Sequence, residues 1–160
     1  MAATRTSAGI LLFRGRGHDL EVLIAHMGGP FWAKKDDHAW SIVKGEYDVA
    51  TEPAFDAARR EFHEETGHPL PDGPTLALGE VRQSGGKTVE AWAVEADFDP
   101  AALVPGTFEL EWPPRSGRTQ AFPEIDRVAW VTSEVAARKL VKAQAAFVDR
   151  LVAARADASA

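Results

Sequence analysis

The stretch that decides the fold runs from Gly45 to His68 and reads GEYDVATEPAFDAARREFHEETGH. Apolar residues in its second half recur with the spacing of one helix face, at Phe55, Ala58 and Phe62. Pro53 suits a first helical turn, and Gly67 is typical of a helix end. The stretch therefore predicts a loop followed by a helix over residues 51–66.

Three glutamates of this helix, Glu61, Glu64 and Glu65, stand at positions i, i+3 and i+4. They fall within an arc of roughly 100° at 3.6 residues per turn, so their carboxylates converge. Their repulsion and the negative end of the helix dipole each cost about a few tenths to 1 kcal/mol. A hard cation such as Mg²⁺ or Mn²⁺ would reverse that cost. A solvated helix end, with Arg60 paired to Glu64, explains these residues as well.

The stretch from Gly45 to Gly67 resembles the Nudix box, G-x5-E-x7-R-E-U-x-E-E-x-G-U, where U is a bulky aliphatic residue. The residues that match in register are Glu52, Arg60, Glu61, Glu64, Glu65 and Gly67, with Phe62 in the hydrophobic place between them. Two positions depart. One extra residue separates Gly45 from Glu52, for which we expect a bulged loop. His68 stands where an aliphatic residue is usual, and we expect a surface residue rather than a ligand.

The resemblance implies a fold of the α/β class, a Nudix-like α/β/α sandwich with a mixed β-sheet. It also implies a divalent-metal-dependent hydrolase that cleaves the pyrophosphate linkage of a nucleoside diphosphate joined to another group. Such substrates include nucleoside triphosphates, dinucleoside polyphosphates, ADP-ribose and nucleotide sugars. A nucleotide-sensing module without turnover is the alternative. The complete set of box glutamates favours the enzyme.

Roles carry over from the box to the matching residues of this chain. The implied metal ligands for Mg²⁺, with Mn²⁺ as an alternative, are Glu61, Glu64 and Glu65, supported by Glu52 and the Gly45 carbonyl. Arg60 would orient a glutamate by a charge-assisted hydrogen bond, and Arg60, Glu61 and Glu64 are the expected catalytic residues. The general base stays open between Glu61 or Glu64 and a distal acid, for which the candidates are Glu111, Glu124 and Asp126. Each distal candidate is equally well read as an ordinary surface acid.

Substrate contacts are expected from loops near the box. Lys44 directly precedes Gly45 and could meet a phosphate. Phe31 and Trp32 belong to a polar loop next to the box and could stack a base, although most tryptophans at such positions belong to a core. Arg115 lies in a loop rich in proline and glycine, where a solvated charge is the ordinary reading.

The rest of the chain predicts strands followed by a terminal helix. We expect a first hairpin (7–14 with 20–26), an irregular loop (27–39), a short strand (40–43), a second hairpin (75–83 with 88–96), strands at 108–112 and 128–131 with a loop at 113–120, and a helix over 133–152 capped by Ser133.

The composition bounds the protein class. The 160 residues suggest one domain over 1–152 and a frayed tail over 153–160, with 45% hydrophobic and 26% charged residues. No run approaches about 18 apolar residues, so neither a membrane span nor an export signal is expected. There is no cysteine, and a cytoplasmic protein is the expectation. The net charge of −6 argues against duplex nucleic acid and leaves a small phosphorylated partner. A monomer and a homodimer are both compatible.

Overall fold

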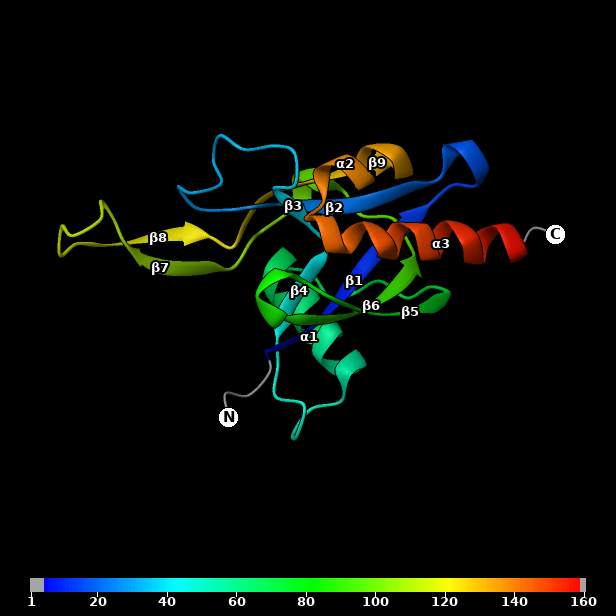
Figure 1. Ribbon diagram of the computed structural model, residues 1–160, viewed down its shortest axis with the longest axis horizontal. Coiled ribbons are helices and arrows are strands. Elements are labelled where there is room, and N and C mark those ends of the chain that lie inside the picture. The colour runs from blue at the N-terminus through cyan, green and yellow to red at the C-terminus, as the bar shows by residue number, and fades with distance from the viewer. Residues whose placement is uncertain (1–4, 159–160) are drawn as a thin grey trace.

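The computed structural model describes residues 5–158 and has a seven-stranded mixed sheet between helices (Figure 1). The strands of this sheet are β1 (Thr6–Arg14), β2 (Glu21–Met27), β3 (Trp40–Ser41), β4 (Val43–Glu46), β5 (Thr75–Arg82), β6 (Thr88–Glu95) and β9 (Ile125–Thr132). The helices are α1 (Ala54–Thr66), α2 (Ser133–Lys139) and α3 (Ala145–Ala158). A separate two-stranded sheet consists of β7 (Thr107–Glu111) and β8 (Thr119–Pro123). No helix in the described range is long and apolar enough to cross a membrane.

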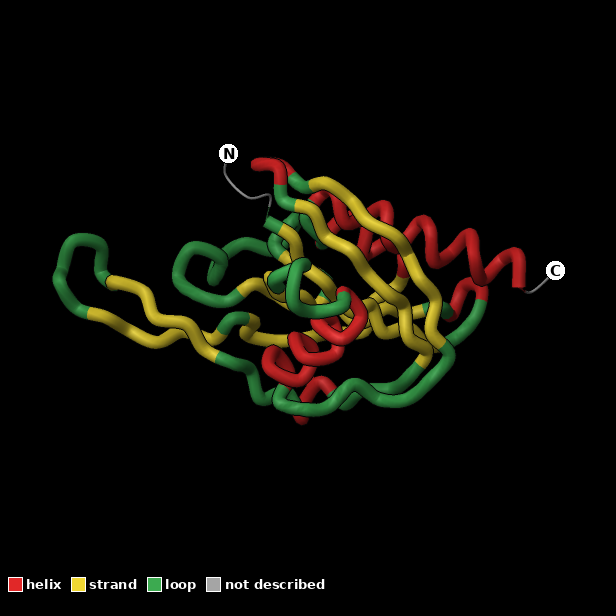
Figure 2. Tube along the Cα trace, turned by 90° about the horizontal axis from the view of Figure 1, so that it is seen from below, coloured by secondary structure: helices red, strands yellow, loops and turns green. Residues whose placement is uncertain are grey.

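Strand β1 lies at the centre and is buried on both faces. Leu11 and Phe13 belong to the core shared with α2 and α3, whereas Ile10 and Leu12 belong to the core shared with α1. This alternation follows from the two-residue period of a strand. Figure 2 shows α1 crossing one face of the sheet, with α3 on the other. The predicted α/β/α sandwich is confirmed.

The sheet forks between β1 and β2. These two strands pair only near their hairpin, where Phe13 faces Val22. Further along, β3 pairs with β2 and β4 pairs with β1, so the segment 40–46 fills the widening gap. On its other edge β1 runs parallel to β6. The sequence predicted one strand over 40–43, but the change of partner at Ile42 divides the segment into β3 and β4.

The buried side chain of Gln144 completes the hydrogen bonding at the fork. The Ile42 backbone N–H donates to Gln144 Oε1 at 2.8 Å. Gln144 Nε2 donates to Ser41 Oγ at 3.1 Å and to Gln83 Oε1 at 2.8 Å. An unpaired backbone N–H is costly inside a protein, so this side chain supplies the acceptor that no strand provides there.

The box helix is shorter than the sequence predicted. Helix α1 begins at Ala54 because residues 51 and 52 belong to a turn in which the Asp48 carbonyl accepts from the N–H groups of Thr51 and Glu52. This turn accommodates the extra residue of the box. Gly67 ends the helix in the left-handed region, at φ 80°, as expected for its position.

The prediction of one continuous terminal helix over 133–152 is wrong. It breaks at Leu140, which is extended and forms a bridge with Trp40. A short 3₁₀ turn, Lys142–Gln144, then leads into α3 and brings Gln144 to the fork. The cap is also one residue earlier than predicted, because the side chain of Thr132, rather than that of Ser133, accepts from the Val135 N–H.

Helix α3 continues to Ala158, whereas the sequence suggested a frayed tail from residue 153. Leu151 is buried, and the Arg155 guanidinium lies over the Phe13 ring at 5.3 Å. These contacts extend the helix past Val152. The last two residues of the predicted tail lie outside the described range.

The hairpin of β7 and β8 projects from the body of the molecule (Figures 1 and 2). Both hairpins predicted nearer the N-terminus are confirmed, but β8 was missed, because its sequence TQAFP is short and polar and ends in proline. Residues 119 and 120, predicted as loop, therefore belong to a strand. The final strand, β9, begins at Ile125, three residues before its predicted start.

Candidate active site

Arg60 connects three of the box glutamates. Its guanidinium makes a bidentate pair with Glu52, at 3.0 and 2.9 Å. Its Nη1 also donates to Glu61 Oε1 at 2.8 Å and to both carboxylate oxygens of Glu64 at 3.2 Å. The hydrogen bonds that Arg60 donates to Glu52 are the largest cause of its raised pKa. A permanently charged group thus holds three carboxylates at the start and end of α1.

Glu61 is buried between α1 and β4. The residue is only 7% exposed, and its carboxylate rests against the backbone of Gly45. A Cβ atom at position 45 would lie 1.9 Å from Glu61 Oε2. Burial raises the pKa of Glu61, whereas Arg60 opposes that shift. A side chain at position 45 would therefore displace the Glu61 carboxylate.

A pocket of about 340 Å³ opens beside this contact, at the fork of the sheet. It is lined by Met27, Gly28, Trp32, Ser41, Ile42, Lys44, Glu65, Phe108, Glu124 and Ile125. A larger cavity of about 600 Å³ lies between the hairpin of β1 with β2 and the helices α2 and α3. None of the predicted site residues lines that larger cavity, so chemistry rather than size points to the pocket at the fork.

The charges of the pocket influence one another. Burial raises the pKa of Glu65 to about 8, with repulsion from Glu124, Glu61 and Glu64 adding to the effect and Lys44 opposing it. Burial also lowers the pKa of Lys44. Glu124 has its pKa raised by loss of hydration, which the nearby Lys44 ammonium opposes. Two carboxylates and one ammonium therefore line the same pocket.

The box acids do not form a ready-made cage. Within residues 5–158, no group of three or more His, Asp or Glu side chains is arranged to hold a metal ion. The acids are kept apart because Arg60 donates hydrogen bonds to Glu52, Glu61 and Glu64, whereas Glu65 lines the pocket. The donor set nevertheless fits a hard divalent cation, because it consists of oxygens only and three of its carboxylates share one guanidinium, that of Arg60.

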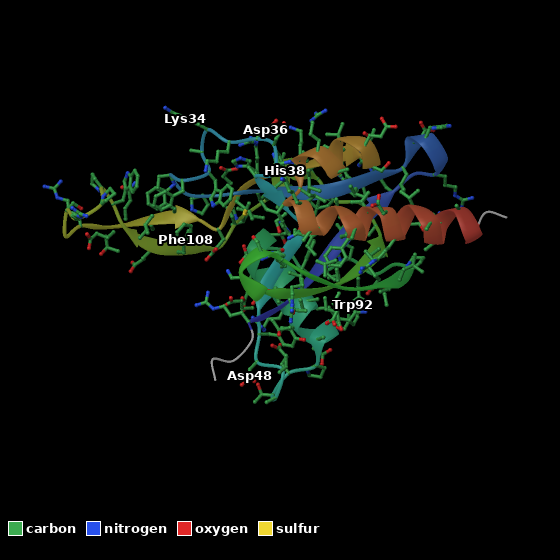
Figure 3. All side chains as sticks on the ribbon, in the orientation of Figure 1. Lys34, Asp36, His38, Asp48, Trp92 and Phe108 are labelled. Carbon is green, nitrogen blue, oxygen red and sulfur yellow. The ribbon has the colours of Figure 1, made fainter. Side chains whose placement is uncertain are left out.

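Aromatic side chains form one side of the pocket. Trp32 comes from the loop between β2 and β3, and Phe108 comes from β7, two segments far apart in the sequence. Figure 3 shows Phe108 at the base of the projecting hairpin, below the loop that carries Lys34, Asp36 and His38. The sequence had proposed Trp32 for a substrate contact. It missed Phe108, whose place in a predicted strand carried no functional signal.

Phe31 lies outside the pocket lining. It is 60% exposed, and its ring meets Trp112 edge to face, with centroids 5.6 Å apart. This contact joins the loop between β2 and β3 to the hairpin. Arg115, at the hairpin tip, is exposed and has a φ of 62°. Neither residue contributes to the lining.

The three distal acids separate in space. Glu124 lines the pocket, directly before β9. Asp126 contacts His26 and Arg127 instead, and Glu111 is an exposed residue near the end of the hairpin. The structure thus brings only Glu124 together with the box residues.

His68 is not the surface residue that the sequence suggested. It is half-buried, its ring packs edge to face on Phe98 with centroids 5.6 Å apart, and its Nε2 lies 2.6 Å from the Ala102 carbonyl oxygen. A ring of this size fills the place of the usual aliphatic residue, while the nearby carbonyl accepts its polar N–H.

The sandwich, with an acidic strand-loop-helix at its forked sheet, defines a protein of the Nudix class. A model of the NUDIX domain matches residues 3–151. The chain therefore belongs to the Nudix family, and the enzyme class predicted from the sequence, a Nudix-type phosphoanhydride hydrolase, is confirmed at the level of the family. A search of curated proteins gave no match.

Solved structures share the fold at low sequence identity. An Ap4A hydrolase of C. elegans, in a binary complex, is 18% identical with a TM-score of 0.64 and covers 96% of this chain and 99% of its own. The NUDIX domain of Shewanella oneidensis NrtR, complexed with ADP ribose, is 14% identical with a TM-score of 0.58, covering 100% and 91%. The Nudix hydrolase RenU of M. smegmatis is 22% identical with a TM-score of 0.57, covering 98% and 89%.

Proposed function

We propose that this protein hydrolyses the pyrophosphate linkage of a small nucleoside diphosphate derivative with the help of a divalent cation. The observation that carries the proposal is the meeting of Lys44, Glu65 and Glu124 at one pocket, beside the contact of Glu61 with Gly45. A phosphate needs positive charge, and a hydrolytic step needs a carboxylate base. The pocket offers both, at the box that the family uses.

The cation would be held by Glu61, Glu64 and Glu65, with the Gly45 carbonyl and Glu52 in support. Mg²⁺ suits this set best because it prefers carboxylate oxygens together with waters and phosphate oxygens, and Mn²⁺ is the alternative. When bound, such a cation neutralises charge on the phosphate oxygens and acidifies an attacking water.

The side chains of this chain would do the remaining work. Arg60 orients Glu61 and Glu64 through its hydrogen bonds. The Lys44 ammonium would attract a phosphate oxygen at the floor of the pocket. Glu124 is the best general base among the distal acids, because it alone of the three lines the pocket and loss of hydration raises its pKa.

The aromatic side of the pocket supports a nucleotide-like substrate. Trp32 and Phe108 present ring faces and edges on which a base can stack, while the phosphates lie toward Lys44. Two structures that share the fold are named for nucleotide ligands, Ap4A and ADP ribose. A nucleoside triphosphate, a dinucleoside polyphosphate, ADP-ribose or a nucleotide sugar would each place a diphosphate next to a base.

A nucleotide-sensing module without turnover is the second candidate, favoured by one observation: Arg60 occupies three of the box carboxylates in the described structure. Such a module would bind nucleotides through the same pocket. The complete box favours the hydrolase, since a sensor has no need of every carboxylate.

A substrate panel tests the hydrolase. Nucleoside triphosphates, dinucleoside polyphosphates, ADP-ribose and nucleotide sugars are incubated with the protein and Mg²⁺ or Mn²⁺, and released phosphate, pyrophosphate and nucleotides are resolved by chromatography. We expect turnover of at least one class, abolished by EDTA and restored by added cation. Nucleotide binding by calorimetry without any product would favour the sensing module and contradict the hydrolase.

A further inference from the structure

The short segment between β3 and β4 lies at the pocket but has few backbone partners of its own. Residues 40–42, which we call the fork segment, contribute Ser41 and Ile42 to the pocket lining. Ser41 is the last residue that pairs with β2, and Val43 is the first that pairs with β1. No strand pairing among residues 5–158 includes Ile42. The backbone of Ile42 therefore depends on side chains for its hydrogen bonds.

The side chains of Gln144 and Ser41 close a ring of hydrogen bonds with the Ile42 backbone. The Ile42 N–H donates to Gln144 Oε1, and Gln144 Nε2 donates to Ser41 Oγ. Ser41 Oγ in turn donates to the Ile42 carbonyl oxygen at 2.7 Å. A backbone N–H can only donate, so the oxygen of the Gln144 amide must face Ile42. Gln144 has no exposed surface, and its side chain thus replaces the neighbouring strand that Ile42 lacks.

Gln83 anchors the Gln144 amide from outside the pocket. The second hydrogen bond of Gln144 Nε2 is donated to Gln83 Oε1 at 2.8 Å. Gln83 is fixed in the turn after β5, where its N–H donates to the Lys87 carbonyl at 2.7 Å and its carbonyl accepts from the Gly86 N–H at 3.2 Å. Gln83 does not belong to the pocket lining. A turn 61 residues away in sequence therefore helps to orient the amide that holds Ile42.

The chain that carries Gln144 is also tied to the fork segment by its backbone. Leu140 forms a parallel bridge with Trp40, and the Val141 N–H donates to the Trp40 carbonyl at 2.9 Å. The 3₁₀ turn Lys142–Gln144 follows, and the side chain of Gln144 continues the contact where the backbone turns away. The position of Gln144 is therefore fixed relative to the segment that it holds.

The box residues are held in another way. Strand β4 pairs with β1 along Val43–Glu46, which includes Lys44 and Gly45. Glu61 and the other box carboxylates bonded to Arg60 depend on that guanidinium. Loss of the Gln144 amide would therefore release Ser41 and Ile42, while the pairing of β4 and the bonds of Arg60 stay in place.

We propose that Gln144, anchored by Gln83, is a positioning residue that holds Ser41 and Ile42 in their places at the pocket. Without the amide, the buried Ile42 N–H has no acceptor, and the fork segment must move to find one. Such a movement changes the shape of the pocket and leaves the box intact, so substrate binding is affected more than the reacting groups. Only this kinetic consequence rests on the proposed hydrolase function.

The hold on the fork segment is tested without any substrate. Gln144→Met matches the size of the side chain and removes its amide. We expect the Ile42 amide to exchange its hydrogen about tenfold faster or more in this variant, the effect of losing one buried hydrogen bond, while the amides paired between β4 and β1 keep their protection. An Ile42 amide that exchanges as slowly as in the wild type, relative to those of β4, overturns the proposal.

A pair of variants at Gln83 separates positioning from folding, because this half-buried residue lies outside the pocket. Gln83→Glu keeps an oxygen that accepts from Gln144 Nε2, so KM should stay near the wild-type value. Gln83→Met removes that acceptor and should raise KM about threefold to tenfold with a smaller change in kcat. KM is measured with ADP-ribose, or with the compound of the substrate panel that is hydrolysed fastest. Equal KM values for the two variants contradict the role of Gln83.

Two controls complete the set. Ser84→Ala changes the exposed neighbour of Gln83 in the same turn and should leave KM and Ile42 exchange unchanged. Val148→Ala weakens the buried core on α3 and should lower stability without singling out the Ile42 amide or raising KM. A rise of KM in Val148→Ala equal to that in Gln144→Met would reduce the effect to stability and overturn the positioning role. If no compound is turned over, the hydrolase proposal fails, while amide exchange still decides the role of Gln144.

Discussion

The Nudix box and the loop of residues 28–39, which we call the pocket loop, meet at one pocket together with the neighbouring hairpin, but they are built in opposite ways. In the box, Glu52, Arg60, Glu61 and Glu64 are joined within a stretch of 13 residues by one arginine. On the other side, Trp32 and Phe108 are 76 positions apart in sequence and meet only at the pocket. The difference teaches that the box, the proposed reacting end of the site, is built from neighbours in sequence, whereas the aromatic side, proposed to select the substrate, is built by tertiary contacts.

The largest effect is expected in the box. Replacing Glu65 or Glu64 by Gln keeps the shape and removes a charge, so turnover should fall by about 10²- to 10³-fold, as for the loss of one electrostatic group at a reacting centre. Steady-state kinetics at saturating Mg²⁺ measure this effect. Asp56→Asn, an exposed acid on the same helix, is the control and should change nothing. Full activity in both glutamate variants would show that these two carboxylates take no part in the mechanism.

Gly45→Ala tests the contact between strand and helix inside the box. The added Cβ would meet the Glu61 carboxylate, which must then leave its place. We expect a loss of stability of about 1–3 kcal/mol from overpacking, measured by urea denaturation, together with a fall in kcat. Glu46→Ala, at the exposed neighbouring position, is the control and should show neither change. Wild-type kinetics in Gly45→Ala would mean that Glu61 has no fixed role.

The pocket loop should affect binding rather than turnover. Trp32→Ala removes a ring on which a base could stack, which is worth about 1–3 kcal/mol per base, so KM should rise about tenfold or more while kcat changes less. Trp92→Phe is the control. Trp92 packs on Phe55 against α1, away from the pocket, and a ring at that position is retained. An equal fall of kcat in Trp32→Ala would place this ring in the reaction rather than in selection.

The smallest effect is expected at the hairpin tip. Arg115 is exposed and lies outside the pocket lining, so Arg115→Ala should change KM by at most about threefold, the size of a solvated charge effect. The measurement is repeated at low and high salt, since a screened charge loses its influence at high salt. A large, salt-sensitive rise in KM would show that the hairpin closes over the substrate.

Much of the site's reacting half could be predicted from sequence. The spacing of Glu61, Glu64 and Glu65 gave their common helix, and Gly67 gave its end, because helical periodicity and a left-handed cap are local properties. The role of Glu124 could not be chosen over those of Glu111 and Asp126. That choice depends on which strand end approaches the pocket, and no spacing along the chain carries this information.

The errors in the fold have the same origin. The predicted strand over 40–43 was divided at Ile42, and the predicted terminal helix was broken at Leu140, because both segments exchange contacts with partners about 100 residues away. Gln144 connects the two breaks, because it lies in the 3₁₀ turn that follows the end of α2 and its side chain accepts from the Ile42 N–H. Local propensity favours one continuous strand and one continuous helix, but the need to pair buried backbone groups breaks both.

The sequence by itself determined the box helix and its converging glutamates, because helical periodicity and short spacings are local properties, and its resemblance to the Nudix box implied the family and the sandwich fold. The tertiary structure alone decided three things: that Glu124 joins the pocket, that Phe108 lines it beside Trp32, and that β1 runs parallel to β6. Each of these depends on the packing of strands that are distant in sequence, where the free energy of burial and the pairing of polar groups select one arrangement from many.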